Sequence, residues 1–96
     1  MLNKKNKKLL ISKSMTMTAG YQIGKNGISE NTINLLSNAL DAHELIKISV
    51  LNNVDVSVNE IALDLSSSLH ADIVEIIGNK IVLYRFSKRK DINHIL

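Results

Sequence analysis

The sequence predicts an α/β domain built as a two-layer sandwich, with helices packed on a four-stranded mixed sheet. Three observations predict this class. Apolar residues recur at helical spacing in the middle of the chain, short runs rich in β-branched residues alternate with those stretches, and Gly78-Asn79 forms a two-residue hairpin turn. The expected order is α-β-α-β-α-β-β. Strands that alternate with helices are joined by parallel crossovers, and the hairpin adds an antiparallel pair.

Three helices are expected, over residues 4–16, over residues 29–43 and from Ser57 onward. Ser29 is a good N-cap for the second helix, and Glu60, three residues after Ser57, completes a capping box for the third. Both of these helices carry an apolar stripe that faces the sheet. The stripes consist of Ile33, Leu36 and Leu40, with Leu35, Ala39 and Ala42 beside them, and of Ile61, Ala62, Leu65 and Leu69.

Strands are expected at residues 21–23, 45–51, 73–77 and 80–86. The hairpin turn sets a register that pairs Ile76 with Ile81, Val74 with Leu83 and Asp72 with Arg85 on the face under the helices. Arg85 therefore either forms a cross-strand ion pair with Asp72 or contacts a phosphate directly.

The opposite face of the sheet is too apolar to stay bare on a monomer. Its expected residues are Leu45, Leu51, Ile73, Ile77, Val82 and Tyr84. The first helix covers part of this face through Leu9, Leu10 and Ile11, or a protein partner covers it. An adaptor that binds a protein partner on this face is therefore the alternative function.

Length and composition bound the possible functions. Residues 1–96 are enough for one hydrophobic core, so we expect a single domain with its core over 4–87 and a basic tail over 88–96. The absence of cysteine excludes disulfides and thiolate zinc sites. No apolar run near the N-terminus is long enough for a signal peptide or a membrane span, so we expect a cytoplasmic protein without a membrane partner.

Charge is segregated along the chain behind a formal net charge of +3. Residues 1–25 contain six lysines and no acid, residues 26–84 carry a net charge of −6, and residues 85–96 carry +3. Two basic ends around an acidic middle favour a polyanionic partner. Lysine-rich chain ends can also be simply solvated, and composition does not decide between the two interpretations.

The run Gly24-Lys25-Asn26-Gly27 connects the first strand to the second helix. Glycines let the backbone approach a ligand closely, main-chain amides at a helix N-terminus favour an anion, and Lys25 adds a positive charge. These features are typical of a phosphate clamp. They are equally typical of a strand-to-helix turn in which Asn-Gly supplies positive φ angles.

The sequence shows no catalytic constellation. None of the three histidines has metal-ligand spacing, and no nucleophile elbow, Walker sequence or dinucleotide fingerprint is present. We therefore expect no enzymatic activity, no cofactor and no small-molecule substrate. The chain has only three aromatic residues, so stacking on bases is limited and a nucleic acid would be held by its backbone.

Three segments share the order and spacing of one known family. They are Gln22 to Gly27, His43 to Ile48, and Ile77-Gly78 followed by Val82 to Arg85. Together they resemble the CRM domain, in particular the small stand-alone YhbY-like bacterial RNA-binding proteins, over about residues 4–87. The resemblance implies a fold like the C-terminal domain of translation initiation factor 3. It also implies binding to structured RNA, in particular rRNA in precursors of the large ribosomal subunit during ribosome biogenesis.

The resemblance places the RNA-facing residues on the glycine loop (Gly24–Gly27), on the basic first helix and in the Leu-Tyr-Arg segment of the last expected strand. They are Gly24, Lys25, Asn26, Gly27, Lys4, Lys5, Lys7, Lys8, Lys13 and Arg85, and Lys88 and Arg89 of the tail extend the expected contact. The chain departs from the family at Ala19-Gly20, where proline is frequent, and at Asn79, where arginine is frequent. Its first helix carries only lysines, which lack the bidentate fork of arginine.

Overall fold

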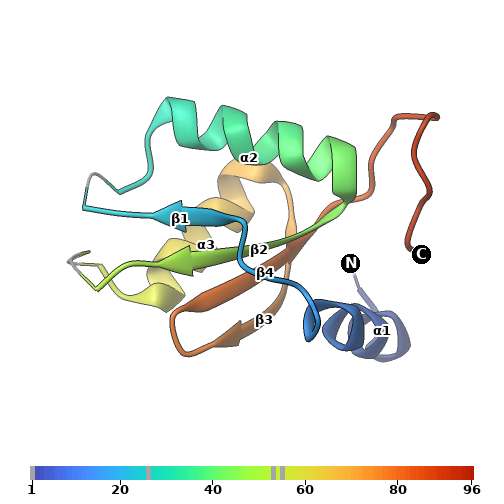
Figure 1. The fold of residues 1–96 in the computed structure, drawn as a ribbon, viewed down its shortest axis with the longest axis horizontal. Helices are drawn as coiled ribbons and strands as arrows, with labels where there is room; N and C mark the ends of the chain where they lie inside the picture. Colours follow the sequence, from blue (N-terminus) through green and yellow to red (C-terminus); the bar gives the residue numbers. More distant parts are fainter. Residues whose placement is uncertain (1, 26, 53, 55) are drawn as a thin grey trace.

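The computed structural model describes residues 2–25, 27–52, 54 and 56–96, and its elements follow the predicted order (Figure 1). They are α1 (Lys4–Ser14), β1 (Tyr21–Ile23), α2 (Glu30–His43), β2 (Leu45–Val50), α3 (Val58–Leu69), β3 (Asp72–Ile77) and β4 (Lys80–Tyr84). The strand order is β1-β2-β4-β3. β1 and β2 are parallel, and β4 is antiparallel to both of its neighbours. The predicted α/β class with a four-stranded mixed sheet is confirmed.

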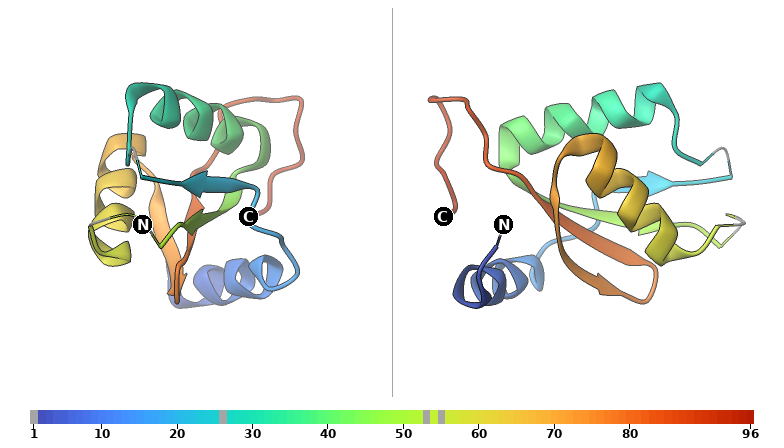
Figure 2. Two further views of the ribbon diagram at one scale, coloured as in Figure 1. Left: turned by 60° about the vertical axis from the view of Figure 1, so that its left-hand side comes forward. Right: turned by 180° about the vertical axis from the view of Figure 1, so that it is seen from behind.

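Helices α2 and α3 lie on one face of the sheet (Figure 2) and begin at the predicted caps. Ser29 Oγ accepts a hydrogen bond from the Thr32 amide, and Ser57 Oγ accepts one from the Glu60 amide, each at 3.2 Å. These bonds satisfy amides that the first turn of a helix leaves unpaired. A capping box has two bonds, one from the Glu60 amide to the Ser57 side chain and one from the Ser57 amide to the Glu60 side chain. The described hydrogen bonds include the first of these two.

The predicted apolar stripes form the main core between these helices and the sheet. All four predicted residues of α3 are buried, as are Leu36, Ala39 and Leu40 of α2, whereas Leu35 is 56% exposed. The inward-facing strand residues of this core are Ile23, Ile46, Ile48, Val50, Ile81 and Leu83. Burial of one such aliphatic side chain stabilises a fold by about 1.5–3 kcal/mol, so this cluster holds the two layers together.

The register of the β3–β4 hairpin matches the prediction only near the turn. Ile76 lies opposite Ile81 as expected, but a β-bulge between Ile73 and Glu75 shifts the pairing, so that Ile73 rather than Val74 lies opposite Leu83. The predicted pairing of Val74 with Leu83 is therefore wrong. A one-residue shift moves side chains to the other face. Ile73 consequently packs on the helix side, and Val74 is buried on the opposite side.

Helix α1 covers part of that opposite face. Leu10 is fully buried, at 0% exposure, in a second cluster with Leu45, Val74, Val82 and Tyr84. Ile11 packs against this cluster as expected, whereas Leu9 is 44% exposed. The first of the two expected arrangements is therefore the one observed. The strand residues that a protein partner would have needed at this end of the sheet are already covered by the chain itself.

The molecule is elongated, and different elements lie at the two ends of its long axis. The Cα atoms extend over 36 × 24 × 23 Å. Figures 1 and 2 show α1 and the C-terminal tail at one end of the long axis, and the β1–α2 and β2–α3 loops at the other. In the part of the chain that the structure describes, no helix is both long and apolar enough to cross a membrane.

Candidate nucleic-acid interface

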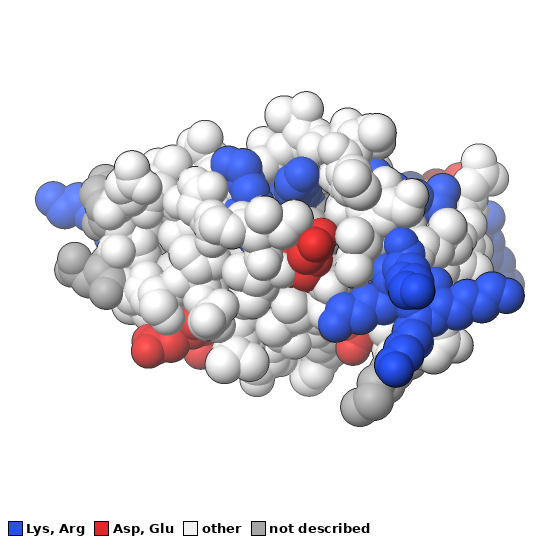
Figure 3. All heavy atoms as spheres, turned by 90° about the horizontal axis from the view of Figure 1, so that it is seen from below, with Lys and Arg blue, Asp and Glu red and all other residues white. Residues whose placement is uncertain are grey.

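The exposed face of α1 is a dense cluster of lysines. Lys4, Lys5, Lys7 and Lys8 occupy its first turns, and Lys13 lies in its last turn; all five are exposed. None of them takes part in a salt bridge within the described residues. Figure 3 shows basic side chains gathered at the end of the molecule where α1 lies. The predicted basic helix therefore presents its charge to solvent at one end of the molecule.

The four lysines near the N-terminus of α1 do not stabilise the helix that carries them. The N-terminus of a helix has a partial positive charge, so cations there are unfavourable, and the first turn of α1 contains no acid. Lys4 also lies three and four positions before Lys7 and Lys8, a spacing at which like charges repel by about 0.2–0.5 kcal/mol per pair. Asn3 supplies the cap, because its side-chain oxygen accepts the Asn6 amide at 2.7 Å. An anion bound here would relieve both unfavourable effects.

Helix α1 is fixed on the sheet by Lys47 of β2. Its Nζ donates hydrogen bonds to the carbonyl oxygens of Ser14, at 3.2 Å, and Met17, at 3.3 Å. Carbonyls at the end of a helix lack partners within the helix, and a cation is favourable there. Together with the burial of Leu10, this contact sets the position of the lysine cluster.

The glycine loop is a closed turn. The Gly27 amide donates to the Gly24 carbonyl at 2.8 Å, and Gly27 has a φ angle of 67°. The turn interpretation is therefore confirmed at Gly27, the residue of the Asn-Gly pair that the structure describes. A phosphate clamp needs main-chain amides that are free to bind an anion. The Gly27 amide and the Thr32 amide at the start of α2 do not meet this expectation, because both are bonded inside the protein. Asn26, a predicted contact residue, lies outside the described residues.

Lys25 is exposed in this loop but far from the lysines of α1. The loop lies at one end of the long axis and α1 at the other (Figure 1), and Figure 3 shows basic side chains at both ends. The structure therefore does not bring the glycine loop and the basic helix together into one compact site. An RNA that contacts both would have to extend along the molecule.

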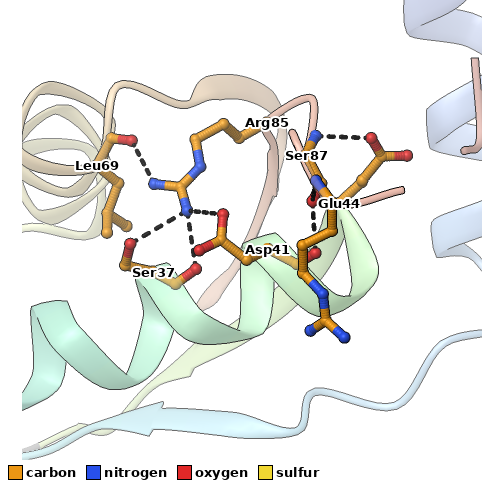
Figure 4. A network of polar contacts seen from close by, with 7 residues as sticks. Ser37, Asp41, Glu44, Leu69, Arg85 and Ser87 are labelled. Carbon is orange, nitrogen blue, oxygen red and sulfur yellow. Dashed lines mark hydrogen bonds and ion pairs between the residues drawn. The ribbon is translucent and has the colours of Figure 1, made fainter. Parts of the chain in front are cut away.

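Arg85, a predicted contact residue, is bonded within the fold (Figure 4). One terminal nitrogen donates to the Leu69 carbonyl at 2.9 Å, and the other donates to Asp41 Oδ1 at 2.9 Å and to the carbonyl and hydroxyl oxygens of Ser37. The predicted ion pair with Asp72 is wrong, because the bulge places Asp72 opposite Tyr84 and the partner of Arg85 is Asp41. The guanidinium thus ties the end of α3 to α2.

The C-terminal tail is held by the buried carboxylate of Glu44. Oε2 accepts the Ser87 amide at 2.7 Å and lies 2.8 Å from His94 Nδ1, and Oε1 accepts the Ile95 amide at 2.9 Å. Burial, the largest effect, raises the pKa of Glu44. The hydrogen bonds from Ser87, His94 and Ile95 outweigh burial and place this pKa below its ordinary value of 4.5. Glu44 therefore accepts these bonds as a carboxylate.

Between these contacts, residues 88–93 form what we call the tail loop. Lys88, Arg89 and Lys90 are exposed on it. Arg89 donates from Nε and a terminal nitrogen to Asp91, at 2.9 and 2.6 Å, and these bonds lower the pKa of Asp91. An exposed ion pair of this kind contributes little and opens easily. The tail loop lies at the same end of the long axis as α1 (Figure 1).

Comparison with known proteins shows the family of this chain. The chain matches the model of the CRS1/YhbY (CRM) domain over residues 2–85. It belongs to the CRM family. This CRM chain is similar to "Probable RNA-binding protein YqeI" of Bacillus subtilis (strain 168), with 43% identity over 88 residues that cover 92% of each protein. It is also similar to the solution structure of the hypothetical protein SAV1595 from Staphylococcus aureus, a "putative RNA binding protein", with 40% identity, 95% of each chain covered and a TM-score of 0.78.

The sequence did not predict the two residues that hold the basic segments of this CRM protein in place. Glu44 and Lys47 belong to a segment that carries the family resemblance, but no role was expected for either. The available signal was a charged residue beside or between apolar strand residues, because such a charge is seldom buried without a partner. The identity of the partners, Ser14 for Lys47 and Ser87 for Glu44, required the three-dimensional structure.

Proposed function

We propose that this CRM protein binds structured RNA without catalysing a reaction, and that the lysines of α1 hold the RNA by its phosphates. The supporting observation is the cluster of Lys4, Lys5, Lys7 and Lys8, exposed and unfavourably placed for the helix itself. Lysine is a compact positive charge suited to phosphate oxygens. The names of the similar bacterial proteins agree with RNA as the polyanion.

The scarcity of exposed aromatic rings favours contact with the RNA backbone rather than with the bases. Tyr84 is buried, Tyr21 is half-buried, and Phe86 alone of the three is largely exposed, at 58%, where it stacks on His94 with ring centroids 4.7 Å apart. Proteins that recognise single-stranded RNA on a sheet need several exposed rings on which bases stack. We therefore expect modest sequence preference and a strong dependence of affinity on salt.

The proposed target is rRNA in precursors of the large ribosomal subunit, as the family resemblance implies. Lys25 of the glycine loop would add a second, distant contact on an extended RNA. Cross-linking the protein to RNA in cells and sequencing the attached fragments tests the target. Enrichment of large-subunit rRNA over tRNA and mRNA is expected, and a fragment set without such enrichment would contradict this target.

The RNA-binding surface itself is tested by replacing the four N-terminal lysines of α1 with alanine and titrating a labelled RNA hairpin at several salt concentrations. If the five lysines of α1 neutralise about five phosphates, they contribute about −3.5 to −4.5 to the slope of log affinity against log salt. The alanine variant should lose roughly 3 from the magnitude of this slope. A matched variant with arginine at the same positions keeps the charge and should keep the slope. Wild-type affinity and slope in the alanine variant would refute the proposal.

The alternative adaptor function is not supported by the structure. It requires an exposed apolar face that includes Val82 and Tyr84, and both are buried in the cluster around Leu10 of α1.

A further inference from the structure

One carboxylate closes the tail loop at both of its ends. The Ser87 amide, just before the loop, and the Ile95 amide, just after it, bond to the two oxygens of the Glu44 carboxylate, and His94 adds a third contact. Residues 88–93, which lie between these anchors, have no contact of their own with Glu44 among the described hydrogen bonds. The tail is therefore held as a closed loop that exposes three basic side chains, Lys88, Arg89 and Lys90, together with Asp91 and Asn93.

Neighbouring contacts reinforce this closure. The Ser87 hydroxyl donates to the Asp41 carbonyl at 2.6 Å and accepts the Arg89 amide at 3.1 Å. His94 stacks on Phe86, at an interplanar angle of 17°. Ile95 packs on the same apolar cluster that anchors α1. The two basic ends of the chain are thus fastened to one region of the fold, the tail by Glu44 and α1 by Lys47 and Leu10.

Burial of a charged carboxylate costs desolvation free energy, which makes it an inefficient way to stabilise a short tail. Apolar residues of similar volume often stabilise as well as a buried ionic group, whereas an ionic group fixes one particular arrangement through directed hydrogen bonds. A loop ordered before binding also loses less conformational freedom when it contacts a ligand. What this arrangement presents to solvent is Lys88, Arg89 and Lys90, at the same end of the molecule as the lysines of α1.

We infer that Glu44 is a positioning residue for RNA binding, because its carboxylate holds the tail loop so that Lys88 and Lys90 form a second phosphate-binding surface. This inference rests on the proposed RNA-binding function. Arg89 joins the surface when an RNA phosphate displaces Asp91 from its guanidinium. Phosphates of one folded RNA would then contact both ends of the chain.

The surface is tested with the full chain and a labelled RNA hairpin. Lys88→Ala combined with Lys90→Ala removes two exposed charges and no described hydrogen bond, so the fold should be unchanged. The magnitude of the salt slope should fall by about 1.4–1.8, with roughly tenfold weaker binding. Lys88→Arg with Lys90→Arg is the matched control and should bind like the wild type. Unchanged affinity and slope in the alanine pair would overturn the inference.

The positioning role is tested with Glu44→Gln, whose amide group cannot accept the bonds that one carboxylate oxygen accepts. Its salt slope should fall to that of the Lys88→Ala and Lys90→Ala pair, and adding that pair to Glu44→Gln should cause no further loss. ¹⁵N relaxation should show the tail loop amides becoming mobile. If Glu44→Gln does not fold, His94→Ala keeps the carboxylate, removes one of its contacts together with the stacking on Phe86, and should change the slope in the same direction. A mobile tail with the wild-type slope would overturn the role of Glu44.

The outcomes also separate this inference from the proposed function. If the wild type itself shows no salt-dependent binding to the hairpin, the RNA-binding proposal fails and the inference fails with it. If the α1 alanine variant loses binding while the tail variants do not, the proposed function stands and only the inference is refuted.

Discussion

Lys47 Nζ lies 3.2 Å from the carbonyl oxygen of Ser14, a residue 33 positions earlier in the chain. This hydrogen bond joins the second strand of the sheet to the last turn of α1. A side chain of the α/β core thereby sets where the lysines of the first helix point. The RNA-binding proposal depends on this docking, because a detached α1 would carry the same charge without a defined surface.

Lys47→Met tests this docking. The substitution keeps most of the apolar stem but removes the donor for the carbonyls of Ser14 and Met17. Hydrogen bonds to charged groups contribute about 1.5–3 kcal/mol, and partial exposure lowers this value, so the free energy of unfolding should fall by about 1–2 kcal/mol. Urea denaturation measures it. Lys13→Met, at an exposed lysine of the same helix, is the control, and an equal effect of the two substitutions would contradict the docking role.

Leu10→Ala and Leu9→Ala form a neighbouring pair that tests the packing of α1. Leu10 is completely buried and Leu9 is 44% exposed. Truncating a buried leucine costs about 2–5 kcal/mol, whereas most surface substitutions change stability by about 0.5 kcal/mol or less. Thermal or urea unfolding should show this order, and similar losses for both variants would mean that α1 does not pack as observed.

Gly27→Ala tests the turn at the glycine loop. Gly27 has a φ angle of 67°, at which a Cβ is strained even though no atom lies within 4 Å of its position. We expect a loss of about 1–2 kcal/mol in the free energy of unfolding. Gly20→Ala is the control, because that site is also open and its φ angle is not in the left-handed region. A Gly27→Ala variant as stable as the control would contradict the turn geometry.

Arg85→Lys separates a structural role from an RNA contact. A lysine ammonium cannot reach Leu69, Ser37 and Asp41 at once, as the guanidinium fork does. The free energy of unfolding should fall by about 1–3 kcal/mol, while the salt slope of RNA binding stays unchanged. Weaker RNA binding at unchanged stability would restore Arg85 to the interface.

Stability should depend on pH through Glu44. Its pKa is lower in the folded protein than in the unfolded chain, whose value is close to 4.5. The unfolded chain therefore binds more protons in this range, and the contribution of Glu44 is fully present above about pH 4.5 and lost as pH falls through the folded value. Titratable groups that face the carboxylate are His94 and, more distantly, Tyr84. Denaturation of the wild type and Glu44→Gln across this range checks it, and identical acid profiles would contradict it.

Most of the fold could be predicted because its determinants are local. Ser29 and Ser57 cap helices through residues three positions away, and Gly78-Asn79 sets the first hairpin pairs. The β-bulge before Glu75 could not be predicted, since both possible registers bury an isoleucine or a valine against an apolar cluster. The likeness to the domain of translation initiation factor 3 stays a prediction.

The candidate site was predictable in its charge but not in its assembly. The lysines of α1 stand out in the sequence because no acid accompanies them. Arg85 and Glu44 bond to residues more than 40 positions away, Asp41 and Ser87, and a pattern of neighbouring residues does not reveal such partners. The glycine loop is likewise separated from α1 by strand β1: α1 precedes this strand and the loop follows it, at opposite ends of the long axis (Figure 1).

The most direct test of the central claim is a titration of the ¹⁵N-labelled protein with an RNA hairpin, followed by the amide chemical shifts. The account predicts that the largest changes occur along the exposed face of α1, from Lys4 to Lys13, and that the exposed side of α3 around Leu63 stays unaffected. Changes confined to α3, with α1 unperturbed, would contradict it.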